Sequence, residues 1–129
     1  MLSWRNSGLA RIVAWSVAIL LTVLSIVPPD LRPETPLPHY VEHFVAYAVM
    51  GAAFGYGDER RPTLLVLYLV IFCAVIEALQ LLAPGRHARL SDFITDAIAV
   101  CAGVAVVSLT KKFHSRRTAR LGWRAAKPR

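Results

Sequence analysis

The sequence predicts an all-α fold: a polytopic membrane protein whose four transmembrane helices form a bundle. The hydrophobic fraction is 56% and the mean hydropathy is +0.49, which is too apolar for an ordinary soluble domain of 129 residues. The apolar residues gather in four segments that are separated by short polar connections. No segment alternates apolar and polar residues as a β-strand does, and only helices and closed barrels span a bilayer.

Proline residues set several ends of the predicted helices. The first apolar segment stops at Pro28, Pro62 suits the start of the third, and Pro84 ends it. At about 1.5 Å per residue, each segment can cross a hydrocarbon core of about 30 Å with some tilt or thinning. We expect the first helix to be retained, because no small-x-small cleavage site precedes Pro28. The four segments are residues 9–27, 41–57, 62–83 and 93–110.

Basic residues predict the orientation, because Lys and Arg collect in the short cytoplasmic loops of membrane proteins. Twelve of the fifteen lie at the N-terminal end, between the second and third segments, or in the C-terminal tail. The opposite side has only Arg32, Arg86 and Arg89. Both termini are therefore predicted to be cytoplasmic, and the connections at residues 28–40 and 84–92 are predicted to face outward.

The C-terminal part of the chain is strongly basic. Eight Lys and Arg residues lie within residues 111–129. We predict a transmembrane domain at residues 1–110, followed by a disordered cytoplasmic tail at residues 111–129 that helps to fix the topology. Much of the net charge of +7 therefore belongs to the tail. Nucleic-acid binding would require a basic face on a folded module, and the sequence shows none.

Six polar residues, two on each of three predicted helices, converge near the outer end of the bundle. A carboxylate in hydrocarbon costs several kcal/mol unless it is paired or reaches water, so such residues usually mark a site. The members of each pair are three or four positions apart, which places them on one helix face. We expect the three faces to meet in an outward-open pocket. The residues are His43 and Tyr47, Glu77 and Gln80, and Asp92 and Asp96.

Small residues continue two of these faces toward the cytoplasmic side. Gly51 and Gly55 follow at four-residue intervals on the second predicted helix. Ala99 and Gly103 continue the face of the fourth at spacings of three and four from Asp96. Small residues at such spacing allow membrane helices to approach closely, so the two faces are predicted to pack against each other.

Arg86 is the natural counter-charge, since it can reach back to Glu77 or forward to Asp92. In a functional interpretation, Arg86 together with Arg89 holds an anionic headgroup. Glu77, His43 and Asp92 then supply hydrogen bonds or acid–base chemistry. In a structural interpretation, the same groups form a self-satisfied salt-bridge network that locks the outer loop. The sequence leaves both interpretations open.

The two acids near the start of the fourth helix differ in depth. Ser91 or Asp92 could cap that helix, whose dipole favours an acid at its N-terminus. Asp96 lies about one turn deeper, so we expect it to be paired with Arg86 or His43, or to be protonated.

A metal site is disfavoured. His43, Glu77 and Asp92 would be suitable hard ligands, but no ligand spacing lies within one helix. We therefore predict no metal and no cofactor. His39 and His87 fall in the predicted outer loops and are interpreted as surface residues.

The ordered set of polar residues resembles the VanZ-like family of small bacterial membrane proteins. The resemblance implies a fold of about four helices. The family is associated with low-level resistance to the glycopeptide antibiotic teicoplanin. Family members often have Asp-Lys where this chain has His39-Tyr40, and an Asn where it has Asp96. The pocket is therefore more acidic here, and Arg86 is its pivotal positive group. The likeness covers about residues 40–103, through His43-Phe44, Tyr47, Glu77, Gln80, Pro84-Gly85-Arg86 and Leu90-Ser91-Asp92.

We therefore predict a multi-pass protein of the bacterial inner (cytoplasmic) membrane that binds or modulates a lipid-linked or anionic headgroup at the outer leaflet. Membrane lipids are the expected partners, and a lipid-linked cell-wall precursor and a second copy of the chain are further candidates. The alternative is a membrane-embedded hydrolase or transferase acting on such a precursor, with His43 or Glu77 as general base. Whether the protein is an enzyme stays open. A proton relay through Glu77 and Asp96 is less favoured, because no repeat or broken helix is visible.

Overall fold

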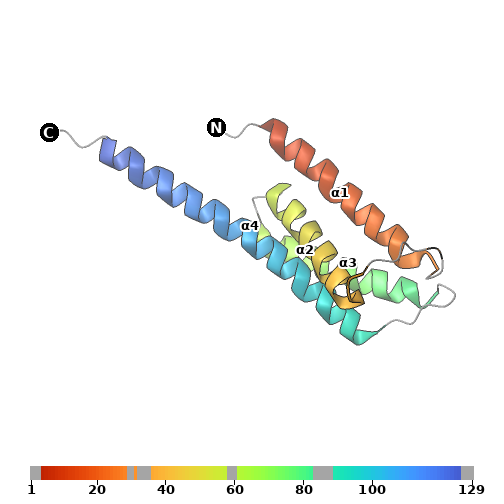
Figure 1. Cartoon of the computed structure of the whole chain (residues 1–129). Helices are drawn as coiled ribbons and strands as arrows, with labels where there is room; N and C mark the ends of the chain where they lie inside the picture. The colour runs from red at the N-terminus through yellow and green to blue at the C-terminus, as the bar shows by residue number, and fades with distance from the viewer. Residues whose placement is uncertain (1–3, 29–30, 32–35, 58–60, 83–88, 126–129) are drawn as a thin grey trace.

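The computed structural model describes residues 4–28, 31, 36–57, 61–82 and 89–125, with side chains described between residues 8 and 118. These residues form four helices and contain no β-strand, so the predicted all-α class is confirmed for the described chain. The helices are α1 (Trp4–Ile26), α2 (His39–Gly57), α3 (Pro62–Gln80) and α4 (Leu90–Ala125) (Figure 1).

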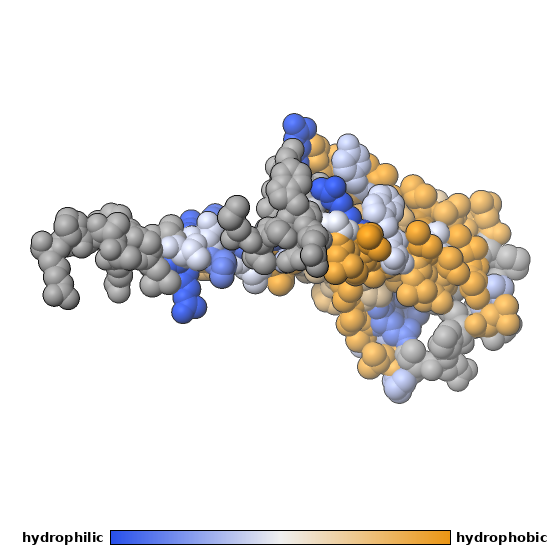
Figure 2. All heavy atoms as spheres, turned by 90° about the horizontal axis from the view of Figure 1, so that it is seen from above, coloured by the Kyte–Doolittle hydropathy of each residue, from blue (hydrophilic) through white to orange (hydrophobic). Residues whose placement is uncertain are grey.

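Within the described residues, three helical stretches are long and apolar enough to cross a membrane. These are Gly8–Ile26, Pro62–Gln80 and Leu90–Thr118, with mean hydropathies of 2.2, 2.4 and 2.0. Helix α2 is not among these three stretches, and His39, Glu42 and His43 occupy its first turns. Figure 2 shows hydrophobic residues over much of the bundle surface, as expected where the surrounding medium is lipid. The prediction of a membrane protein is therefore supported by three of the four predicted segments.

Helices α2 and α4 run in the same direction and form the central pair of the fold (Figure 1). Helix α1 packs against α2, and α3 packs mainly against α4. Direct contact between α1 and α3 is slight, so the bundle is open between these two helices. The largest fully buried side chains lie where α2, α3 and α4 meet, and they are Tyr47, Met50, Cys73 and Val100.

Two glycines set the close approach of α2 and α4. A Cβ atom on Gly51 would overlap the carbonyl oxygen of Val100 and lie 2.9 Å from its Cα. A Cβ atom on Gly103 would overlap the carbonyl oxygen of Ala48 and lie 2.7 Å from the backbone nitrogen of Ala52. The two small-residue faces predicted from the sequence therefore do meet, and side chains are excluded at these two contact points.

Helix α4 extends well beyond the bundle and ends at Ala125 (Figure 1). This differs from the disordered tail predicted for residues 111–129, of which 126–129 lie outside the described residues. The Lys, Arg, Ala and Leu residues of this part favour helix, and the packed first half supplies the nucleus that a new helix would lack. Lys111 also fastens α4 to the end of α2, because its Nζ donates to the carbonyls of Gly55 (3.2 Å) and Tyr56 (2.9 Å).

Candidate functional site

His43 and Asp96 form a buried pair between α2 and α4. The Nδ1 atom of His43 lies 3.1 Å from Oδ1 of Asp96 and 3.4 Å from Oδ2. The two residues are only 8% and 2% exposed. An ionised carboxylate can only accept, so in that state of Asp96 the Nδ1–H of His43 is the donor and Nε2 is left for other partners. Of the partners expected for Asp96, the structure shows His43.

A second His–Asp pair lies one turn nearer the end of the bundle. His39 Nε2 is 4.0 Å from Oδ2 of Asp92, and the rings of His39 and His43 lie 4.3 Å apart. His39 and His43 are four residues apart on α2, and Asp92 and Asp96 are four residues apart on α4. Two imidazoles of α2 therefore face two carboxylates of α4.

His39 belongs to this cluster, although the sequence pattern predicts it to lie in an outer loop. It is exposed, as predicted, but it opens α2 instead of preceding it. The Pro38 carbonyl accepts from the backbone nitrogens of Val41 (2.9 Å) and Glu42 (3.3 Å), which places the first helical turn at His39. Pro38 directly before the helix, and the four-residue spacing to His43, were the signals that could have identified it.

Tyr47 lies one turn deeper on the same face of α2. Its ring stacks on that of His43, with centroids 5.9 Å apart and an interplanar angle of 22°. Its hydroxyl oxygen is buried and makes no hydrogen bond to the described part of the chain, although the buried Ser25 of α1 lies beside it. The predicted polar face of α2 thus continues into the core as a column of rings formed by His39, His43 and Tyr47.

Glu77 joins the end of α3 to the start of α4. Its side chain is buried, and its Oε1 accepts a hydrogen bond from the backbone N–H of Arg89. Gln80, three residues further on the same helix, is also buried. Because Arg89 directly precedes α4, the bond to Arg89 places Glu77 at the same end of the bundle as the two His–Asp pairs, so all three helices contribute polar groups there.

Ser91 and Asp92 lie inside the first turn of α4 and do not occupy its cap. The carbonyl of Arg89 accepts from the backbone nitrogens of Asp92 (2.9 Å) and Phe93 (3.2 Å), so Arg89 is in the cap position and the helix begins at Leu90. The Ser91 hydroxyl donates to Oδ1 of Asp92 at 3.1 Å. Asp92 therefore combines a position favoured by the helix dipole with its contact to His39.

The predicted site residues fall into three groups. His43, Tyr47 and Asp96 lie together at the α2–α4 contact, and Asp92 joins them through His39. Glu77 and Gln80 reach the same end of the bundle from α3. Arg86, the predicted counter-charge, lies outside the described residues, as does His87. Among the described residues, no three His, Cys, Asp or Glu side chains are grouped so as to hold a metal ion.

No family model, curated protein or solved structure matches the chain. The resemblance to the VanZ-like family therefore stays a prediction that rests on the ordered set of residues described above.

Proposed function

We propose that the chain is a four-span protein of the bacterial cytoplasmic membrane, and that its polar cluster binds the headgroup of an envelope lipid at the outer leaflet. The observation that carries the proposal is the buried His43–Asp96 pair, with Glu77 beside it, at one end of helices that are otherwise apolar. Buried ionisable groups within transmembrane helices are expensive and mark functional sites by default.

The packing of α2 on α4 supports its role as the fourth span. At one end, His39 lies opposite Asp92, and at the other Lys111 holds the last carbonyls of α2. The part of α4 between these contacts belongs to a span that is apolar enough to cross a membrane. A helix that runs parallel to that part from end to end crosses the same thickness.

The Lys and Arg distribution supports placing the cluster at the outer leaflet. His39, Asp92 and the N-terminus of α4 lie at the end predicted to face outward. Lys111 and the basic extension of α4 lie at the other end, as cytoplasmic residues should.

The chemistry of the cluster favours a headgroup that offers both hydrogen-bond donors and negative charge. Asp96, Asp92 and Glu77 retain acceptor capacity beyond the bonds described, which suits the hydroxyl and amide groups of a sugar–peptide headgroup. Arg89, which is exposed directly before α4, and Arg86 in the same connection provide guanidinium groups for phosphate. A lipid-linked cell-wall precursor combines these features, and the VanZ-like resemblance favours the same envelope role.

A second candidate function is hydrolysis or group transfer on such a precursor. It is favoured by one observation, the orientation of His43 by Asp96. This arrangement fixes the ring and stabilises an imidazolium, so that Nε2 of His43 could accept a proton from an attacking water or hydroxyl.

The proposal is tested by lipid binding to the full chain in nanodiscs. The probes are a polyprenyl-diphosphate-linked disaccharide–peptide and phosphatidylglycerol, and the affinity of each is measured by native mass spectrometry. Loss of a charged hydrogen bond is worth about 1.5–3 kcal/mol, so His43→Gln and Asp96→Asn should weaken binding of the preferred lipid roughly ten- to hundredfold. His114→Gln, the same change on the exposed extension of α4, is the matched control and should bind normally.

The possible results separate the two functions. If the wild-type chain and the His43 and Asp96 variants bind the preferred lipid with equal affinity, the proposed binding site is wrong. Conversion of the lipid-linked probe to a new mass, with a rate that depends on His43, would establish the enzyme instead of a binding protein.

A further inference from the structure

We infer that the groove between α1 and α3 is a second lipid site, which takes one acyl chain of an anionic phospholipid from the cytoplasmic leaflet and holds its phosphate at Arg11. The groove encloses a cavity of about 450 Å³, within the size range of ligand pockets. It lies in the half of the bundle away from the His43–Asp96 cluster and shares no residue with it.

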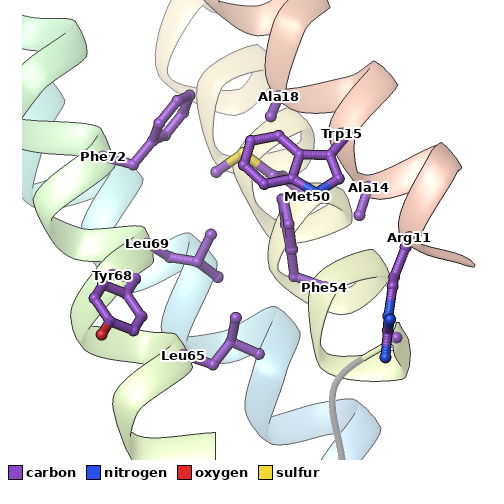
Figure 3. A pocket seen from close by; sticks show the side chains of 11 residues that line it. Arg11, Ala14, Trp15, Ala18, Met50, Phe54, Leu65, Tyr68, Leu69 and Phe72 are labelled. Atoms are coloured by element: carbon purple, nitrogen blue, oxygen red, sulfur yellow. The ribbon is translucent and has the colours of Figure 1, made fainter.

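The groove exists because α1 and α3 hardly touch each other. Figure 3 shows its two walls, with Ala14, Trp15 and Ala18 on α1 and with Leu65, Leu69 and Phe72 on α3. Met50 and Phe54 of α2 form the floor. The lining is therefore almost wholly apolar, and exposed apolar side chains of α1 and α3 surround it.

Aromatic side chains shape the groove. Trp15 of α1 meets Phe54 of α2 edge to face, with ring centroids 5.4 Å apart. Trp15 is 60% exposed and Tyr68 on the opposite wall is 66% exposed, so each ring has one face free for a partner. Apolar rings that stand on both sides of an open channel suit a flexible hydrocarbon chain.

Arg11 gives the groove a charged end. Figure 3 shows Arg11 at one end of the pocket. Arg11 lies beside Gly57, where α2 ends, and a Cβ atom on Gly57 would come within 3.2 Å of Cγ of Arg11. The absence of a side chain at Gly57 therefore lets the Arg11 stem lie along the end of α2 with its guanidinium at the membrane surface. Arg11 has no ion pair within the described part of the chain.

The two halves of the site match the two halves of a phospholipid. A guanidinium pairs with phosphate, and the apolar channel begins beside it and leads toward the middle of the bundle. From Arg11 to Ala18 the channel follows about 10 Å of α1, at about 1.5 Å per residue. An anionic lipid satisfies the charge and fills the channel at the same time, which neither free phosphate nor an uncharged lipid does. The inference takes only the choice of leaflet from the proposed topology.

Trp15 provides a direct reporter of this site. The chain has three Trp residues, so Trp4→Phe and Trp123→Phe leave Trp15 as the single fluorophore. This full-length protein is placed in phosphatidylcholine vesicles that contain a small, equal fraction of either brominated phosphatidylglycerol or brominated phosphatidylcholine. Bromine quenches the indole only on contact, so quenching measures which lipid occupies the groove.

We expect brominated phosphatidylglycerol to be enriched about fivefold at Trp15, the effect of roughly one basic charge near an anionic lipid. Arg11→Gln should remove this preference. Arg61→Gln is the matched control, because Arg61 is an exposed cation at the same end of the bundle that does not line the groove. It should leave the preference in place.

Three results would overturn the inference. The first is equal quenching by the two lipids, and the second is an Arg11→Gln variant that keeps the preference. The third is weak quenching by both lipids that declines further as the protein-to-lipid ratio rises, which would show that a second copy of the chain fills the groove. Because the polar cluster is untouched in all these variants, headgroup binding there succeeds or fails independently.

Discussion

Asp96 of α4 lies 3.1 Å from the Nδ1 atom of His43 on α2, and the contact joins two helices that are 53 residues apart in the sequence. Both side chains are buried, so the pair is a fixed part of the α2–α4 interface. In a low-dielectric interior, each partner offsets the desolvation of the other, and loss of one leaves an unpaired polar group. The same contact orients the imidazole for any ligand that reaches it.

A double-mutant cycle should therefore reveal strong coupling between His43 and Asp96. We expect His43→Gln and Asp96→Asn each to lower the free energy of unfolding by about 3–5 kcal/mol, and the double variant to cost about 1–3 kcal/mol less than their sum. Unfolding of the detergent-solubilised chain by denaturing detergent, followed by circular dichroism, provides the measurement. His39 and Asp92 form a more exposed pair at 4.0 Å and serve as the control cycle, with coupling near zero. Equal coupling in the two cycles would contradict the assignment.

The glycine contacts predict a sharp dependence of helix packing on one methyl group. Gly103→Ala should destabilise the fold by about 1–3 kcal/mol or more, because the new Cβ would overlap the Ala48 carbonyl and force α2 and α4 apart. Gly8→Ala is the matched control, since its Cβ would meet nothing within 4 Å. Thermal unfolding of both variants in the same detergent tests this. A normal melting temperature for Gly103→Ala would mean that α2 and α4 do not approach as closely as described.

Patterns within a single helix predicted the position of the helices and the residues that share a face. Hydropathy and the prolines located the helices, because lipid exposure requires long apolar runs and Pro62 begins α3. Four-residue spacing placed His43 and Gly51 on the face of α2 that meets α4, as a single helix period determines which residues share a face. These features are encoded within one helix at a time.

Features that depend on two helices were harder to predict. The choice of His43 as the partner of Asp96 depends on the register of α2 on α4, which the glycine contacts set and a single helix does not reveal. Recognition of His39 depended on the first turn of α2, a boundary that shifted by two residues from the predicted start. The role of Glu77 involves the backbone N–H of Arg89, a partner that no side-chain pattern marks.

Two substitutions of Glu77 should separate its structural role from its functional one. Glu77→Gln keeps an amide oxygen that can accept from the Arg89 N–H, so it should retain nearly normal stability. Glu77→Ala removes the acceptor of that part-buried amide and should cost about 1–3 kcal/mol. If the carboxylate also binds the lipid headgroup, Glu77→Gln should lower lipid affinity while the melting temperature stays unchanged. A Glu77→Gln variant with normal affinity and normal stability would limit Glu77 to holding the start of α4.

Cysteine accessibility distinguishes four spans from three. Single cysteines at Leu37→Cys, Ser91→Cys and Ser115→Cys all occupy exposed positions, in a background where Cys73 and Cys101 are replaced by Ala. If α2 crosses the membrane, a membrane-impermeant maleimide should label positions 37 and 91 from outside, and position 115 only after lysis. If α2 does not cross, α3 and α4 are inverted, so position 115 becomes accessible from outside and position 91 does not. Because position 37 is labelled in either case, it serves as the internal control. The exchange between positions 91 and 115 decides between four spans and three, and only four spans place His43 and Asp96 on the same side of the membrane.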